Sequence, residues 1–400
     1  MRRRLLLTLG ALAVVAAYTG VQMLRPLPAL RLQAAVPPRY VFAGAPLVPD
    51  WPAFGQSALG LEGVGLVGSA GDQTPVPIAS VTKLMTALLV VRDHPLAVGQ
   101  AGPEVQLTAT DQALYTAELA AGDSVVAVRA GEALTELQLL EGLLLPSADN
   151  LARVLADWDA GSVAAFVVRM NREARALGMG HTRFGDSSGL DPSSSSTATD
   201  LLRLAAAVMA EPVLAQVADM ASATLPVAGV VHNYDFVLGQ AGVVGLKTGW
   251  TAKAGGCFVA AARDRVGGRS VVALAAVLGA PGGPISAIRT AEAAAVQMLQ
   301  SIWPRLTLAS LVPGSALLRL VSGWHRPVRL LAQPALRMVG WPGLVVRLRL
   351  TRRHLRPALR SGAEVAEIAI LSPQGEVGRV ALRLASPLPA PSLWWRLIDP

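Results

Sequence analysis

Ser80 and Lys83 are the first residues whose types and spacing could do chemistry. The apolar pattern of residues 77–91 predicts a helix, on which residues three apart share one face with Cβ atoms about 5–6 Å apart. The Lys83 amine can then reach the Ser80 hydroxyl, a weak nucleophile that needs a base. A lysine serves as that base when it is neutral, so the pair predicts nucleophilic catalysis. The alternative is a serine and a lysine that only face solvent.

A second motif follows Pro146, at the break between two predicted helices, and reads Ser147-Ala148-Asp149-Asn150. A hydroxyl at Ser147 could relay a proton from Lys83 to a leaving amine. The structural alternative is a helix N-cap, a position that serine often occupies.

A third motif, Lys247-Thr248-Gly249, lies on a predicted strand. Lys247 and Thr248 offer a cation and a hydroxyl to a substrate carboxylate. Gly249 would let the strand backbone approach a ligand, and the charge of Lys247 would help to keep Lys83 neutral. Each motif alone is a weak signal. Together they stand in order, 67 and 100 residues apart, in the local structures that their roles require.

The residues around these motifs resemble D-alanyl-D-alanine carboxypeptidases, which are low-molecular-mass penicillin-binding proteins, from about residue 58 to residue 300. The stretches that carry the resemblance are Pro77–Ala87, Ala130–Glu132, Leu143–Ser147, Met170-Asn171, Leu177-Gly178, Ser188–Asp191, Ser196–Ala198 with Asp200, and Gly245–Thr251.

The resemblance implies a mixed α and β fold like that of serine β-lactamases, in which a sheet is flanked by helices and a smaller β domain follows. It implies removal of the terminal D-alanine through an acyl-enzyme, with Ser80 as nucleophile, Lys83 as base and Ser147 as proton relay. Lys247 and Thr248, with Gly249, would hold the substrate carboxylate, and the backbone N–H groups of Ser80 and Trp250 would form the oxyanion hole.

One residue departs from the family pattern. The family usually has Asn at the third position of the second motif, where this chain has Asp149 followed by Asn150. An Asn donates to a substrate carbonyl, whereas an ionised Asp only accepts. Both residues are therefore candidates for substrate binding. Either a small register shift presents Asn150, or Asp149 stays in place and tunes Lys83 electrostatically.

The expected partner is a peptidoglycan stem peptide ending in D-Ala-D-Ala, with β-lactam antibiotics as covalent inhibitors of Ser80. Asp186 and Asp191 lie near the Ser-rich stretch 187–196, where β-lactamases carry a deacylating carboxylate, and we expect them to cap the loop instead. A β-lactamase or D,D-endopeptidase would share the motifs. A catalytically silent wall-binding scaffold is the alternative of a different class, motivated by Asp149 and the basic C-terminal region.

Charge is divided unevenly along the 400 residues. Residues 1–40 hold six Arg and no acid, residues 41–300 hold 15 basic and 23 acidic side chains, and residues 301–400 hold 14 Arg and four acids. A basic C-terminal region on an exported protein is more suited to binding anionic lipid or wall polymer than nucleic acid. A solvated surface is the alternative.

The only cysteine, Cys257, excludes an intramolecular disulfide. Five histidines without zinc-site spacing predict no metal and no cofactor.

An export signal is expected at the N-terminus, because three arginines precede a largely apolar stretch from Leu5 to Leu24. Its length also suffices for a membrane-spanning helix, so a cleaved signal peptide and a retained anchor both remain open. Either predicts a protein at the outer face of the cytoplasmic membrane or in the cell wall. The C-terminal Trp394–Leu397 could lie at the membrane interface or pack on the β domain.

Four segments are predicted: a signal or anchor over 1–24, a Pro-rich extended linker over 25–56, a catalytic domain over 57–303, and a C-terminal β domain, a small sandwich, over 304–400. Helices are predicted over 77–91, 134–145, 150–158, 166–177, 200–209 and 285–302. A strand or hairpin is predicted over 59–67, and strands are predicted over 243–249, 257–262, 270–278, 344–350, 364–371 and 379–384, with strand-like and turn-like pieces over 104–131.

Overall fold

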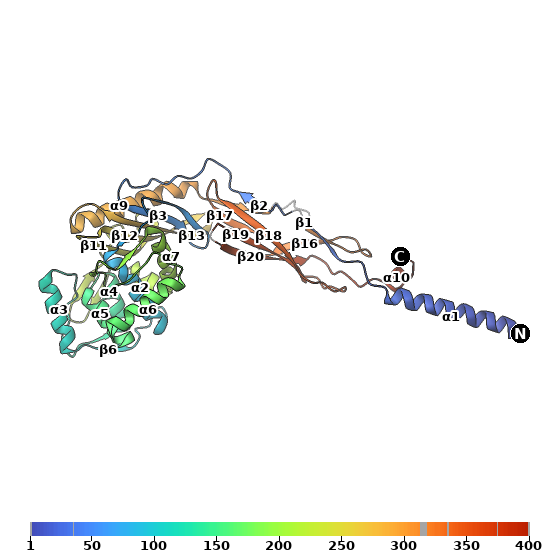
Figure 1. The fold of residues 1–400 in the computed structure, drawn as a ribbon, viewed down its shortest axis with the longest axis horizontal. Coiled ribbons are helices and arrows are strands. Elements are labelled where there is room, and N and C mark those ends of the chain that lie inside the picture. The colour runs from blue at the N-terminus through green and yellow to red at the C-terminus, as the bar shows by residue number, and fades with distance from the viewer. Residues whose placement is uncertain (1, 35, 313–317, 334–335, 374, 399–400) are drawn as a thin grey trace. The chain divides into compact units, whose positions relative to one another are not determined.

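The chain forms two compact units in the structure, a computed structural model that describes residues 2–34, 36–312, 318–333, 336–373 and 375–398. The central unit is residues 44–307, and the terminal unit combines residues 1–43 with residues 308–400 (Figure 1). Each unit has its own sheet. The mixed α and β class expected from the sequence is confirmed.

The central unit holds the three motifs. Its helices are α2 (Lys83–Asp93), α3 (Ala109–Ala121), α4 (Glu136–Leu144), α5 (Asp149–Ala160), α6 (Val163–Ala176), α7 (Ala198–Met209), α8 (Pro212–Ala218) and α9 (Pro284–Ile302), with a 3₁₀ turn η1 (Ala79–Thr82) before α2. Its strands are β3 (Gln56–Leu61), β4 (Gly65–Ala70), β5 (Val76–Pro77), β6 (Glu104–Gln106), β7 (Ala133–Thr135), β8 (Ser195–Ser196), β9 (Ser222–Leu225), β10 (Gly229–His232), β11 (Val243–Thr251), β12 (Gly255–Val266) and β13 (Arg269–Ala280).

A five-stranded antiparallel sheet in the order β11-β12-β13-β3-β4 organises this unit. Alternate residues of β12 divide between the two faces of the sheet. Cys257 and Val259 join the core formed by helices α2 and α4 to α8. On the other face, a Cβ added to Gly256 would lie 2.1 Å from the backbone oxygen of Ala287 in α9. The sheet is buried on both faces, and β11 forms one of its edges.

Helix α3 corrects the expectation of strand-like pieces over residues 104–131. Only Glu118 is buried on α3, so the helix has no apolar stripe for the sequence pattern to reveal. Its start is set locally, because Thr108 and Asp111 form a reciprocal capping box. It ends at Gly122, whose left-handed φ of 83° suits glycine.

The terminal unit contains helices α1 (Arg2–Leu24) and α10 (Leu393–Ile398) and strands β1 (Arg31–Ala34), β2 (Arg39–Val41), β14 (Thr307–Ser310), β15 (Leu318–Val321), β16 (Val328–Gln333), β17 (Arg337–Gly340), β18 (Val345–Arg352), β19 (Glu364–Ser372) and β20 (Gly375–Leu384). Seven of these strands form one sheet in the order β1-β15-β16-β20-β19-β18-β2, and β14 pairs with β17. The expected C-terminal β domain is confirmed.

Residues 25–56 were predicted to form an extended linker, but in the structure part of this stretch forms strands. Strands β1 and β2 come from it and pair with β15 and β18 at the two edges of the sheet. Ala34 and Arg39 are five residues apart and span at most about 17 Å, whereas seven strands in a flat sheet are about 29 Å wide. The sheet must therefore curl so that its edges approach. Backbone pairing, which a Pro-rich composition does not reveal, is what orders this stretch.

Helix α1 is the one helix among the described residues that is long and apolar enough to cross a membrane, over Leu6–Leu24. Two of the polar side chains that interrupt its apolar sequence form hydrogen bonds to backbone carbonyls. The Tyr18 hydroxyl donates to the Leu397 carbonyl of α10 at 3.0 Å, and the Thr19 hydroxyl donates to the Val15 carbonyl at 2.7 Å. Arg396 of α10 also donates to the Met23 carbonyl at 2.7 Å. The two ends of the chain are thus joined within the terminal unit.

Candidate active site

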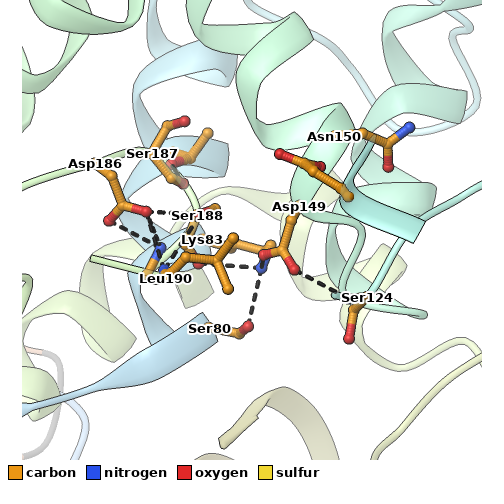
Figure 2. A network of polar contacts seen from close by, with 12 residues as sticks. Ser80, Lys83, Ser124, Asp149, Asn150, Asp186, Ser187, Ser188 and Leu190 are labelled. Carbon is orange, nitrogen blue, oxygen red and sulfur yellow. Dashed lines mark hydrogen bonds and ion pairs between the residues drawn. The ribbon is translucent and has the colours of Figure 1, made fainter. Parts of the chain in front are cut away.

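Ser80 and Lys83 stand at the junction of η1 and α2, and η1 packs against the edge strand β11. Figure 2 shows the two side chains next to each other. In a 3₁₀ turn, residues three apart are nearly eclipsed, and the Lys83 amine lies 2.9 Å from the Ser80 hydroxyl oxygen. Ala79, just before the serine, has the left-handed φ of 48° that a non-glycine residue rarely adopts. The predicted Ser–Lys pair is formed, and the lysine is fully buried.

Three oxygen atoms surround the Lys83 amine nitrogen (Figure 2). They are Ser80 Oγ at 2.9 Å, Asp149 Oδ1 at 2.6 Å and the Ser188 carbonyl oxygen at 3.1 Å. The other carboxylate oxygen of Asp149 accepts the backbone N–H of Ser124 at 3.1 Å. Lys83 and Asp149 are thus a buried ion pair, and burial raises the pKa of the Asp149 carboxyl.

Asn150 takes part in a different contact. Its side-chain oxygen accepts the Val126 N–H at 3.1 Å, and its side-chain nitrogen donates to the Val126 carbonyl at 2.9 Å. The residue is completely buried, so its amide joins α5 to the strand-like segment around Val126 and does not face a ligand. No register shift brings Asn150 to the site, and Asp149 stays beside Lys83. This corrects the expectation that Asn150 binds substrate.

Ser147 precedes α5 but does not cap it. The N-cap of α5 is Ala148, which has no side-chain cap bond. Ser147 itself has a left-handed φ of 65° and is buried. A non-glycine residue keeps this strained conformation only when its surroundings hold it there. The conformation of Ser147 is therefore not explained by capping of α5.

The third motif lies on β11, where Lys247 and Thr248 are both buried. The Lys247 amine donates to the Thr248 carbonyl at 3.0 Å. Burial, followed by the positive charge of Lys83, lowers the pKa of Lys247 to about 7. The charge of Lys83 therefore acts on Lys247.

Close packing explains why position 249 is a glycine, which the sequence did not reveal. A Cβ at this position would lie 2.8 Å from the Ser80 backbone nitrogen and 3.1 Å from the Ala79 Cβ. Glycine therefore lets β11 pass directly beside the nucleophile turn. The next residue, Trp250, pairs with Gly256 of β12 on the inner side of this edge strand. The outer side of β11 belongs to no other strand of the five-stranded sheet.

A Ser-rich loop supplies the third oxygen around Lys83, a role that the sequence analysis did not assign. Asp186 organises the loop by accepting the backbone N–H groups of Gly189 and Leu190 at 2.9 and 3.0 Å and the Ser194 hydroxyl at 2.6 Å. Gly189 lies so close to η1 that a Cβ there would meet the Ala79 carbonyl oxygen at 1.9 Å. Asp186 therefore caps the loop, as expected, and the capped loop presents the Ser188 carbonyl to Lys83.

Other buried acidic groups surround the two lysines. Burial raises the pKa of Asp235, whose charge acts on Lys247, to about 6. It also raises the pKa of Glu118, which pairs with Arg153 at 3.0 Å, to about 7.

Cys257 is buried, and burial raises the pKa of its thiol to about 12, so it is a small core side chain and not a nucleophile. Within the described ranges, no three His, Cys, Asp or Glu residues are grouped to hold a metal ion.

Comparisons with known proteins agree with this geometry. The family model described as D-alanyl-D-alanine carboxypeptidase matches residues 66–282. The carboxypeptidase DacB2 of Mycobacterium tuberculosis is 33% identical over 249 residues, covering 60% of this chain and 81% of that protein. A D-alanyl-D-alanine endopeptidase of Pseudomonas aeruginosa is 32% identical over 245 residues, covering 58% of this chain and 73% of that protein. The crystal structure of penicillin binding protein 6B from Escherichia coli is similar in fold, with a TM-score of 0.61 and 23% identity over 86% of this chain and 99% of that one.

Proposed function

The chain belongs to the D-alanyl-D-alanine carboxypeptidase family of serine peptidases, and from this membership we propose that it removes the terminal D-alanine of peptidoglycan stem peptides through an acyl-enzyme on Ser80. The observation that carries the proposal is the 2.9 Å contact between the Lys83 amine and the Ser80 hydroxyl in a buried setting. Burial strengthens this contact, because water does not screen it.

The substrate peptide binds along the free outer side of β11, where main-chain hydrogen bonds extend the sheet by one strand. Its terminal carboxylate meets the Lys247 ammonium and the Thr248 hydroxyl. The carbonyl carbon of the penultimate D-alanine then lies over Ser80. The N–H groups of Ser80 and Trp250 stabilise the oxyanion, an effect typically worth about 100-fold or more in rate.

Ser80 Oγ attacks that carbon while Lys83 takes the hydroxyl proton, and a C–O bond forms. Ser147 passes a proton to the amine nitrogen of the leaving D-alanine, and the C–N bond breaks. Water then cleaves the ester and frees Ser80. The backbone strain at Ser147 and its position before α5 support this role, since the residue does not cap the helix.

Intact-protein mass spectrometry after incubation with penicillin tests the nucleophile. One adduct is expected, mapped to the peptide that contains Ser80, and none in Ser80→Ala. Release of D-alanine from a diacyl-L-Lys-D-Ala-D-Ala peptide tests the reaction, and the same variant is the control. Wild-type protein that binds cell-wall polymer but forms no adduct and releases no D-alanine would favour a silent scaffold instead.

Endopeptidase activity is the second candidate, because a relative of nearly the same identity carries that name. An endopeptidase cuts a D-alanyl bond in a cross-link, so its substrate continues beyond the point where a carboxypeptidase substrate ends. Comparing turnover of a cross-linked muropeptide dimer with that of the stem pentapeptide separates the two. Cleavage of the dimer alone would replace the carboxypeptidase assignment.

The site works at the outer face of the cytoplasmic membrane. Helix α1 supports this location, since its largely apolar stretch of 19 residues over Leu6–Leu24 is about 28 Å long, close to the hydrocarbon thickness of a bilayer. Helix α10 is bonded to its end through Tyr18 and Arg396 and exposes Leu393 and Trp394, side chains that suit the lipid interface. The mass of the mature protein and its retention in alkali-washed membranes test a retained anchor, and loss of residues 1–24 would contradict it.

A further inference from the structure

The proton of Ser80 needs a destination, and Lys83 alone does not provide one. Lys83 is fully buried and forms an ion pair with Asp149 at 2.6 Å. Within an ion pair the amine is an ammonium group, which already carries three protons. An ammonium group accepts a further proton only when it gives one away at the same time.

Only one of the three contacts of Lys83 can take that proton. The Ser188 carbonyl at 3.1 Å is not basic at neutral pH, and the Ser80 hydroxyl, which accepts an N–H of Lys83 at 2.9 Å, is the source of the proton. The Asp149 carboxylate at 2.6 Å is the remaining partner, and burial raises the pKa of this group. Lys83 has no solvent exposure through which water could take the proton directly.

We propose that Asp149 is the acceptor of the Ser80 proton, with Lys83 as the relay between them. The inference rests on the proposed function. As Ser80 Oγ forms its bond to the carbonyl carbon, an N–H proton moves from Lys83 Nζ to Asp149 Oδ1, and the nitrogen lone pair that this frees takes the Ser80 O–H proton. Lys83 remains an ammonium group, and Asp149 becomes a neutral carboxylic acid. The reverse transfers return one proton through Lys83 and then Ser147 to the leaving amine nitrogen.

The surroundings of Asp149 suit a carboxylate that gains and loses a proton. One oxygen faces Lys83 and the other accepts the Ser124 N–H. Transfer of the proton also removes a buried pair of charges, which is costly to keep in a dry interior. The charged groups that act on Asp149 or Lys83, or on which they act, are Lys247, Glu118 and Asp123.

Asp149→Asn tests the proposal, because it preserves the size of the side chain and the acceptor that faces Lys83 but cannot take a proton. If Asp149 is the acceptor, penicillin acylation of Ser80 at pH 7 should fall about 100-fold or more, the usual contribution of a general base. A neutral Lys83 acting alone predicts the opposite sign, since loss of the carboxylate favours the neutral amine.

The matched control is Asp123→Asn, which removes a negative charge that acts on Asp149 but has no bond to Lys83. It should leave the acylation rate and its pH profile close to those of the wild type. An Asp149→Asn protein that is acylated as fast as the wild type, or faster, would overturn the relay and leave the proposed function standing. Absence of an adduct in the wild type would overturn both.

A measurement on the wild type alone covers the case in which Asp149→Asn does not fold. Two protons that move in one step give a curved dependence of the acylation rate on the D₂O fraction of the solvent. A single proton transferred from Ser80 to Lys83 gives a straight line. A straight line in the wild type would overturn the proposal, and a curve would support it.

Discussion

Replacing Gly249 with alanine should displace the nucleophile without unfolding the protein. The added Cβ would lie 2.8 Å from the Ser80 backbone nitrogen and 3.2 Å from that of Val81. Ordinary van der Waals contacts at such positions begin at 3.4 Å, so the backbones must separate by about 0.6 Å. Both atoms belong to the rigid turn η1, and no flexible side chain can absorb the shift.

The size of the effect follows from this displacement. A misplacement of about 1 Å at a reacting group typically costs about 100-fold in rate, so a shift of about 0.6 Å should slow acylation about 10- to 100-fold. Overpacking a buried site typically costs about 1–3 kcal/mol of stability. Gly249→Ala should therefore fold but react slowly. Stopped-flow acylation with a fluorescent penicillin and the urea midpoint measure the two effects separately.

Gly60→Ala is the matched control. Gly60 lies on β3 of the same sheet, and a Cβ there would be 3.2 Å from the Gly65 carbonyl oxygen. This variant should lose a comparable amount of stability and keep its acylation rate, because the atoms nearest to the added Cβ belong to Gly65 and Leu202 and not to η1. If Gly249→Ala were acylated within twofold of the wild-type rate, the close approach of β11 to η1 at Gly249 would not be what positions Ser80.

Three further predictions concern other contacts of the site. The pKa of Lys247 lies at about 7, so the ammonium that binds the substrate carboxylate is present below that pH and lost above it; kcat/KM should fall above pH 7, and Lys247→Arg should remove this alkaline decline. Asn150→Ala leaves the buried N–H and carbonyl of Val126 without partners, which should lower the free energy of unfolding by about 2–5 kcal/mol, measured by urea denaturation. Asp186→Ala removes the acceptor that holds the loop through Gly189 and Leu190, so the Ser188 carbonyl should move away from Lys83 and acylation should slow. Asp191→Ala, at an exposed position of the same loop, should change the acylation rate little.

The three motifs were predictable because each one is local. A serine and a lysine one turn apart, a serine before a helix and a Lys-Thr-Gly strand all depend on spacing within a few residues. Their secondary structures follow from apolar periodicity, and the elements that carry them were confirmed within a few residues at each end. Helix α3 was missed because its start depends on capping by Thr108 and not on an apolar stripe.

Strands β1 and β2 were missed for a different reason. Their partners, β15 and β18, lie about 290 and 306 residues further along the chain. A short strand at a sheet edge is selected by backbone pairing, which leaves little trace in side-chain pattern. The contact between the Ser188 carbonyl and Lys83 was also not predictable, because every residue has a backbone oxygen and the sequence does not show which one approaches the lysine.

The sequence by itself determined the family, the class of fold and the residues proposed to do the chemistry, because motif identity and periodicity are properties of neighbouring residues. Only the tertiary structure decided between Asp149 and Asn150. Adjacent residues on a helix point about 100° apart, so one faces Lys83 and the other faces Val126. Which of them meets the lysine depends on how α5 packs against α2, and packing is set by contacts between residues far apart in the chain.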